Sequence, residues 1–208
     1  SHHRVDSLFD SSLGVKGGFN LIGSYSGTYR FHFNELYAGT SFLNFKLEAG
    51  WFREEENFYK LSSTNGNIDR SLNARPYPKI RFATDDFIPF FFFKEWFSYK
   101  AEFDEGWLGE EQYVKNNHLH HKSLYGKFKL NNHLYLSAGL DHYVMWGGIS
   151  PDYGKLPEDF SSYLHYITGS AGSSAFPETD QLNVAGNQFG SYLLRLDIFR
   201  DNINMSVY

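Results

Sequence analysis

The chain has 208 residues, a formal net charge of −5 and no cysteine, which excludes a disulfide framework and a thiolate metal site. Aromatic residues make up 19% of the sequence although its mean hydropathy is only −0.46, and no basic tract suggests a nucleic-acid partner. The longest apolar run, residues 87–93, contains Pro89 and falls far short of the roughly 20 apolar residues that a transmembrane helix needs.

Apolar and polar residues alternate along most of the chain. In chain order the alternating segments are 19–31, 43–51, 91–104, 123–130, 133–146 and 191–198, and a short, poorly patterned strand is predicted at 80–86. A period of two places successive side chains on opposite faces of a strand. The sequence therefore predicts about eight or nine antiparallel strands, counting those that are incomplete or weakly patterned.

The segment 133–146 has the clearest alternation. Its apolar face carries Leu134, Leu136, Ala138, Leu140, Val144 and Trp146, and only His142 interrupts this row. A segment of this length exceeds the roughly 5–6 residues typical of strands in globular proteins. It suits a tilted membrane-spanning strand of about 9–11 residues with a protruding end.

The predicted connections alternate between short and long. The short ones are 32–35, 87–89, 131–132 and 200–204, and the long ones are 53–79, 104–121 and 147–190. Outer-membrane barrels have short periplasmic turns and long extracellular loops. Three tryptophans, Trp51, Trp107 and Trp146, fall at the long-loop ends of their strands, which predicts part of an aromatic girdle at a membrane interface.

These patterns predict an all-β fold, specifically an antiparallel up-and-down transmembrane β-barrel of the bacterial outer membrane, in contact with its lipid. Residues 1–208 are expected to form part of a single barrel domain, with 1–16 as a tag or poorly ordered lead-in. A soluble antiparallel barrel or sandwich would alternate in the same way and is the alternative. A soluble core would favour Val, Ile and Leu, whereas the apolar face here is rich in Tyr, Phe and Trp.

Several segments resemble one known family when they are taken together and in order. The most specific is Ser-Leu-Asn-Ala-Arg-Pro-Tyr-Pro-Lys-Ile at 71–80. The others are Leu-Tyr-Ala at 36–38, Ala-Gly-Trp at 49–51, His-Leu-His-His-Lys-Ser-Leu-Tyr-Gly at 118–126, Gly-Leu-Asp-His-Tyr at 139–143, Trp-Gly-Gly at 146–148 and Gly-Asn-Gln-Phe-Gly-Ser-Tyr at 186–192. This combination resembles the Wzi-type capsule assembly proteins, in the form common in Bacteroidetes, over roughly residues 36–199.

The resemblance implies an outer-membrane barrel that binds surface or capsular polysaccharide in a lectin-like, non-covalent way and assists capsule assembly or retention at the cell surface. No enzymatic activity is predicted, and nothing in the sequence indicates a cofactor. Family members are longer, so the chain is expected to cover only part of the barrel. Two alternatives stay open. One is a transport pore, which requires an open lumen, and segment 147–190 is long enough to fold inward and plug that lumen. The other is a structural subunit that contacts other outer-membrane proteins.

Sugar rings stack on aromatic faces, so polysaccharide-binding candidates are sought among loop aromatics and nearby polar side chains. The candidates are Trp107, Tyr113, Tyr153, Tyr163 and Tyr166, with Asp152, Asn183 and Asn187 as polar partners. Arg75 lies beside Pro76, in a segment that prolines hold extended. It is predicted to brace a lumenal carboxylate such as Glu102 or Asp141, with direct contact to an acidic sugar as the second interpretation.

Neither catalytic nor metal-binding residues are predicted. His118 and His120 can share a face of an extended segment, but His121 would point away from them, so convergent metal ligation is not expected. The acidic pairs at 104–105 and 110–111 would suit a glycosidase only if two carboxylates faced one cleft about 5–9 Å apart. No nucleophile elbow, phosphate loop or dinucleotide fingerprint occurs in the sequence.

Overall fold

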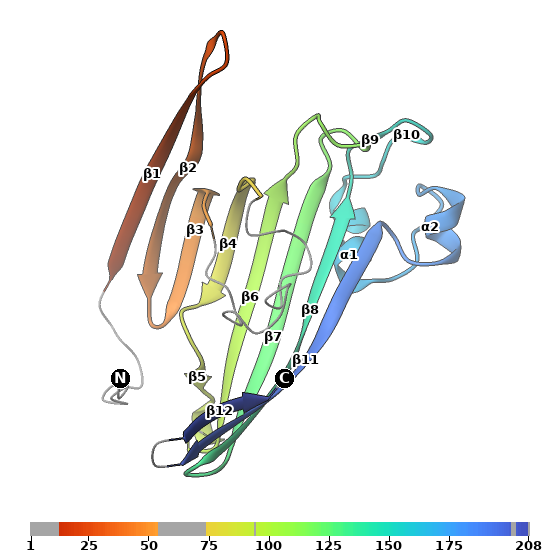
Figure 1. Cartoon of the computed structure of the whole chain (residues 1–208). Helices are drawn as coiled ribbons and strands as arrows, with labels where there is room; N and C mark the ends of the chain where they lie inside the picture. Colours follow the sequence, from red (N-terminus) through yellow and green to blue (C-terminus); the bar gives the residue numbers. More distant parts are fainter. Residues whose placement is uncertain (1–12, 54–73, 94, 201–202, 208) are drawn as a thin grey trace.

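The computed structural model describes residues 13–53, 74–93, 95–200 and 203–207, and their architecture is a large antiparallel sheet with two short helices (Figure 1). The sheet strands are β1 (Gly14–Tyr25), β2 (Tyr29–Phe42), β3 (Phe45–Trp51), β4 (Pro78–Thr84), β5 (Ile88–Pro89), β6 (Phe97–Trp107), β7 (His118–Asn131), β8 (Leu134–Trp146), β11 (Asn187–Arg200) and β12 (Ile203–Val207). The smaller elements are η1 (Phe91–Phe93), β9 (Ile149–Ser150), β10 (Gly154–Lys155), α1 (Phe160–Thr168) and α2 (Glu178–Leu182).

The sheet is an up-and-down meander. Its strand order is β1-β2-β3-β4-β6-β7-β8-β11-β12, and β5 pairs with β6. The predicted all-β antiparallel architecture is therefore confirmed. Within the described residues β1 and β12 are the two ends of this order, so the sheet does not close into a barrel.

The strand register separates the side chains into two faces of opposite character. On one face Ala101, Leu124, Leu140 and Tyr192 are successive partners across β6, β7, β8 and β11. The adjacent row, which points to the other face, is Glu102, Ser123, Asp141 and Ser191. We call these the apolar face and the polar face.

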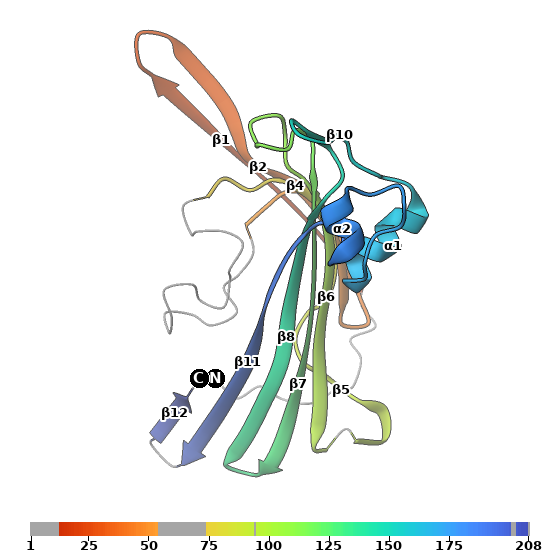
Figure 2. The ribbon, with the colours of Figure 1, turned by 90° about the vertical axis from the view of Figure 1, so that its right-hand side faces the viewer.

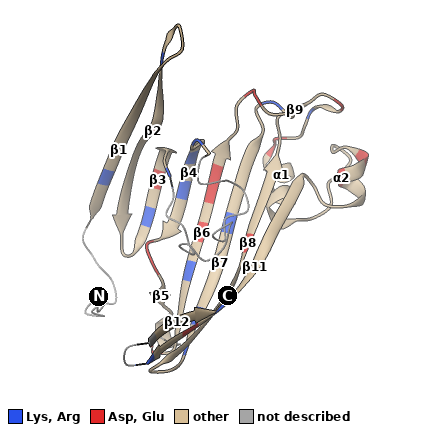
Figure 3. Cartoon of the chain, viewed as in Figure 1, with Lys and Arg blue, Asp and Glu red and all other residues tan. Residues whose placement is uncertain are grey.

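Exposure is the reverse of that in a soluble sheet. Leu124 is 55% exposed and Tyr192 is 92% exposed on the apolar face, whereas Glu102 and Asp141 are buried on the polar face. Figure 3 shows charged residues of both signs within β3 and β6 and basic residues within β4, so charge is not confined to the loops. Several charged side chains of the sheet, including Glu48, Glu102 and Asp104, are thus buried on the polar face, whereas large apolar side chains are exposed on the other.

Two hairpin turns differ from the prediction. Segment 19–31 is not one strand, because Gly27, at a φ of 78°, turns the chain between β1 and β2. Predicted turn 32–35 lies within β2, and the chain turns instead at Leu43 and Asn44, whose φ values are 52° and 67°. Two consecutive residues with positive φ are typical of a type I′ hairpin turn.

Other boundaries also shift. Phe91–Phe93 form η1 instead of opening a strand, and β6 begins at Phe97. Extension of β6 and β7 reduces the predicted connection 104–121 to residues 108–117. The strand β1 begins at Gly14, within the predicted lead-in, while residues 1–12 lie outside the described part of the chain.

Aromatic side chains lie at both ends of the apolar face. At the short-turn end the ring centroids of Phe97 and Phe128 are 4.8 Å apart, and those of Phe93 and Trp96 are 5.0 Å apart. At the loop end Trp51, Trp107 and Trp146 close β3, β6 and β8, as predicted. Trp51 and Trp107 are partly exposed, whereas Trp146 is buried.

Residues 147–186 fold over the loop end of the apolar face. Val144, Trp146, Tyr166, Phe176 and Ala185 form a buried hydrophobic cluster between β8 and this segment. Figure 2 shows α1 and α2 together on one side of the sheet. The segment, which is long enough to fold inward, does not do so in the described structure, because its apolar residues pack on the apolar face. Neither described helix has the length and hydropathy needed to span a bilayer.

Candidate functional site

An ionic network crosses the polar face from β1 to β6. The Arg81 guanidinium on β4 donates to Glu48 on β3, with Nη1 3.2 Å from Oε2, and also donates to Glu102 on β6. Lys16 on β1 pairs with the second oxygen of Glu48. Both carboxylates are buried, and a buried charge is tolerated only when it is paired and hydrogen-bonded. Arg81 therefore links three strands through charge.

His121 continues the network toward β8. Its Nδ1 lies 3.1 Å from Asp104 Oδ2, and its Nε2 lies 3.0 Å from Asp141 Oδ1. The Tyr125 hydroxyl donates to the other oxygen of Asp141. Since both ring nitrogens face carboxylate oxygens, each is assigned a hydrogen, and the ring is a cation. The His121 ring also stacks on Tyr143 with centroids 4.2 Å apart.

Three residues of this network could supply metal ligands. Glu102, Asp104 and His121 each place one ligand atom within 4.8 Å of the others. A metal needs an unprotonated ring nitrogen, but both nitrogens of His121 are engaged with carboxylates in this geometry. The arrangement is therefore that of an ion-pair cluster. The predicted separation of His121 from His118 and His120 is confirmed, because those two lie on the apolar face.

The carboxylates expected to bind Arg75 have other partners. Glu102 is paired with Arg81, and Asp141 with His121 and Tyr125. Arg75 itself is exposed, so the predicted brace is wrong for these two carboxylates. The arginine that does brace the sheet, Arg81, lies between Ile80 and Phe82 in an alternating strand, which places it on the polar face. Residues 71–73 of the signature segment lie outside the described residues.

A second polar cluster lies on the apolar face beneath α1. Glu105 on β6 accepts hydrogen bonds from Trp146 Nε1 at 2.7 Å and from the Tyr163 hydroxyl at 3.1 Å, and it lies 3.1 Å from His120 Nδ1. Burial and the Glu105 charge raise the pKa of the Tyr163 hydroxyl, which keeps it a donor. Lys122 also donates to the Ile167 carbonyl at the end of α1. Tyr163 thus secures α1 to the sheet.

Three of the predicted sugar-binding residues meet on the loop surface. The Tyr113 hydroxyl donates to Asp152 Oδ2 at 2.9 Å, and the Ser150 hydroxyl accepts from the backbone of both Asp152 and Tyr153. Tyr113 is 70% exposed and Tyr153 is 57% exposed. Paired backbone hydrogen bonds between Lys115 and Ile149 join the two loops. We call Tyr113, Asp152 and Tyr153 the loop surface.

The other predicted residues lie elsewhere. Trp107 closes β6 on the apolar face. Tyr166 lies on α1 and is buried in the hydrophobic cluster between β8 and segment 147–186. The Asn183 side chain donates to the Thr179 carbonyl at the end of α2, and Asn187 opens β11 with an exposed side chain. Sequence reasoning missed Gln188, whose amide joins His142, Tyr166 and Ala185; a single glutamine carries no signal of this role.

Glu158 holds the start of the 147–186 segment. Its Oε1 accepts from the Gly148 backbone N–H at 2.9 Å, and Lys155 lies 3.2 Å from its other oxygen. The Gly148 hydrogen bond, followed by Lys155, lowers the pKa of the Glu158 carboxyl below its ordinary value of 4.5. This contact therefore stabilises the loop above pH 4.5 and is lost as the pH falls through the lower folded-state pKa.

We expect the Gly148 amide chemical shift to titrate at a pH below 4.5, because protonation removes the acceptor charge. The measurement is an NMR pH titration of the full-length protein. Glu158→Gln should abolish the inflection, while the Lys115 amide, which donates to the Ile149 carbonyl, should not follow it. An unchanged inflection in Glu158→Gln would assign it to another group.

No protein family, curated protein or solved structure matches this chain. The resemblance to capsule assembly proteins therefore depends on the signature segments themselves. In the structure these are not confined to loops: 118–126 opens β7, 139–143 lies within β8, and 187–192 opens β11.

Proposed function

We propose that this chain forms part of an outer-membrane β-barrel that binds surface or capsular polysaccharide non-covalently through its extracellular loops and assists capsule assembly or retention. The observation that carries the proposal is the reversed polarity of the sheet. Leu124, Leu140 and Tyr192 are exposed on one face, while Glu48, Glu102 and other charged groups are buried on the opposite face. Lipid outside and a polar interior account for both faces at once.

The dimensions of the apolar face agree with a membrane span. Phe97 and Trp107 stand ten residues apart at the ends of β6, which corresponds to about 34 Å along the strand. A tilt of about 40° reduces this to about 26 Å, close to the apolar band of outer-membrane barrels, which is flanked by aromatic girdles. Since lipid does not tolerate open sheet edges, β1 and β12 would pair with further strands in the proposed barrel.

The loop surface supports polysaccharide as the ligand. Tyr113 and Tyr153 expose aromatic rings beside the Asp152 carboxylate, a combination that offers both a stacking face and a hydrogen-bond acceptor. Tyr and similar rings combine apolar area with a polar end. Each contact is weak, and a repeating polysaccharide would gain avidity by engaging several barrels or several loops at once.

We expect the purified full-length barrel to bind capsule polysaccharide from its own organism saturably, and the double variant Tyr113→Ala/Tyr153→Ala to weaken that binding about tenfold, or about 1.4 kcal/mol. Surface plasmon resonance on immobilised polysaccharide would measure it. Tyr192→Ala is the matched control, because it removes an exposed ring from the apolar face. Absence of binding to the native polysaccharide would overturn the proposal, and bilayer conductance would then separate a pore from a structural subunit.

A further inference from the structure

Four central strands carry a patch of polar side chains on the apolar face, at its loop end. We call the patch the outer polar patch, and its members are Glu105, His118, His120, Lys122, His142 and Gln188. The register makes them neighbours, because Glu105 pairs with His120 and Lys122 pairs with His142. His142 is the residue that interrupts the apolar row of β8 in the sequence. Polar groups that face lipid without a partner are costly, so the cover over this patch is informative.

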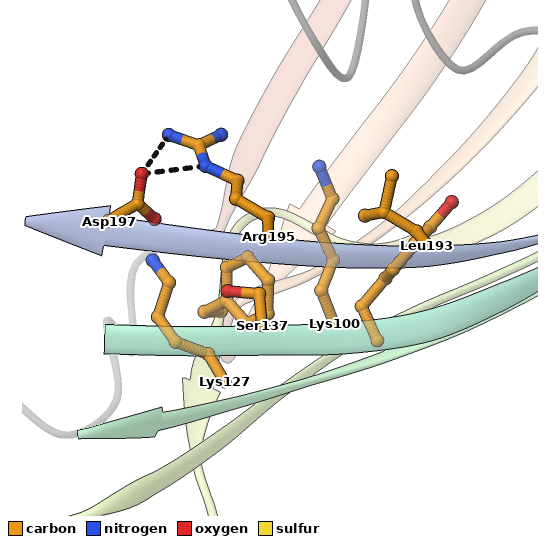
Figure 4. Close-up of a pocket in the computed structure, with 8 residues that line it drawn as sticks. Lys100, Lys127, Ser137, Leu193, Arg195 and Asp197 are labelled. Atoms are coloured by element: carbon orange, nitrogen blue, oxygen red, sulfur yellow. Dashed lines mark hydrogen bonds and ion pairs between the residues drawn. The ribbon is translucent and has the colours of Figure 1, made fainter. Parts of the chain in front are cut away.

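Polar side chains farther along the same strands point the other way. Lys127, Ser137 and Arg195 are successive partners across β7, β8 and β11. Figure 4 shows their side chains together on the polar face, where Arg195 donates to Asp197. Toward the short turn, the apolar face of β8 carries Leu140, Ala138, Leu136 and Leu134. The outer polar patch is therefore a local departure from the pattern of these strands.

The helix α1 is fixed over the outer polar patch by the side chains of the patch. Lys122 donates to the Ile167 carbonyl, and Gln188 Nε2 donates to the Tyr166 carbonyl at 3.1 Å. Carbonyls in the last turn of a helix have no partner within the helix, and here the sheet supplies one for each of these two. His142 Nε2 lies 2.9 Å from the Gln188 amide oxygen. The patch and the end of α1 thus satisfy one another.

The outward side of α1 is apolar. Phe160 and Leu164 are four residues apart, which places them on one side of the helix, and they are 74% and 43% exposed. The sequence has no Asp, Glu, Lys or Arg between Asp159 and Glu178, whereas a helix that faces water normally carries charged residues on its outer side. The Thr168 hydroxyl donates to the Leu164 carbonyl at 2.6 Å, so this polar group is paired within the helix.

The strand register gives the depth of α1. Lys122 pairs with Phe103, four residues from Trp107 along β6, a separation of about 14 Å along the strand and about 10 Å after a tilt of about 40°. Because Lys122 contacts Ile167, the C-terminal end of α1 lies at this level, inside the proposed apolar band. The start of α1 is held at the loop end, where Glu158 accepts from the Gly148 backbone. The helix therefore descends along the apolar face from the rim.

We propose that Phe160 and Leu164 contact the acyl chains of the membrane, and that α1 separates the outer polar patch from lipid. The inference rests on the proposed membrane span but not on polysaccharide binding. Lipid is the occupant because the outward side of α1 continues the apolar face and reaches the depth at which that face would meet acyl chains. Short helices with one apolar side lie in this way at the boundary of a bilayer.

The test is the depth of nitroxide labels on single-cysteine variants of the full-length barrel, in a background without other cysteines and in phosphatidylcholine vesicles. The labelled variants are Phe160→Cys, Leu164→Cys, Leu124→Cys in the middle of the apolar face and Tyr153→Cys on the loop surface. Electron paramagnetic resonance compares collisions with oxygen, which enters acyl chains, and with a polar nickel chelate. The oxygen-to-nickel ratio should be about tenfold higher at position 164 than at position 153, because an apolar region excludes the chelate. Position 160 should be intermediate.

The label at position 124 separates failure of this inference from failure of the membrane span. High ratios at both 124 and 164 would support the inference. A high ratio at 124 with a ratio at 164 as low as that at 153 would overturn it and leave the span intact, because α1 would then face water. Low collision rates with both reagents at 164 would also overturn it, since protein would cover the helix. Low ratios at both 124 and 164 would overturn the span and the inference together.

Discussion

Replacement of Arg81 by alanine is expected to destabilise the folded protein by about 3–5 kcal/mol, the cost of breaking a buried ion pair from one side. The guanidinium serves both Glu48 and Glu102, and both carboxylates are buried. Removal of Arg81 therefore leaves the negative charges of Glu48 and Glu102 buried without the cation that they share. The measurement is reversible urea unfolding of the full-length barrel in detergent or lipid vesicles.

Lys46→Ala provides the control for Arg81→Ala. Lys46 is on the same face, and its partner Asp85 is 70% exposed, so the expected loss is about 0–1 kcal/mol. The double variant Arg81→Met/Glu102→Gln should recover part of the loss, because it removes a buried carboxylate together with its cation. Losses below about 1 kcal/mol for both single variants would show that water reaches the Arg81 network.

Face membership is the part of this structure that the sequence predicts well. Alternation with a period of two is a local property, and it correctly separates Glu102 and Asp141 from Leu124 and Leu140. The loop-end position of the three tryptophans follows from the same pattern. Alternation fails at Gly27, because the hydrophobic period continues unchanged through the turn and only the positive φ of one residue reverses the chain.

Pairing between distant strands is the part that the sequence does not predict. Choosing Arg81 over Arg75 as the partner of Glu102 requires the register of β4 against β6. The contact of Tyr163 with Glu105 spans 58 residues, and no strand pattern marks the 147–186 segment. Its docking on the apolar face depends on tertiary packing of Trp146, Tyr166 and neighbouring side chains, which a local period cannot specify.

A charge placed on the apolar face provides the most direct test of its surroundings. Leu124 points to this face from β7, and Leu130 lies farther along β7 at a register irregularity between Lys129 and Asn131; they are 55% and 54% exposed. Leu124 lies at the middle of the proposed apolar band, and Leu130 lies beside the short turn. Arginine costs about 2–4 kcal/mol at the midplane of a barrel in lipid and about 0–1 kcal/mol near the interface. We therefore expect Leu124→Arg to be strongly destabilising in lipid vesicles and Leu130→Arg to be nearly neutral.

The comparison of these two variants separates lipid from water and from a protein partner. Their starting exposures are almost equal, so a water-facing sheet would tolerate both arginines within about 0.5 kcal/mol, as surface substitutions usually do. A depth-dependent difference in the free energy of unfolding, measured in vesicles, is expected only if a bilayer covers this face. Equal, small effects of the two variants on the free energy of unfolding would contradict the membrane span. If Leu124→Arg instead only removes the protein from a purified complex, a partner protein covers the apolar face.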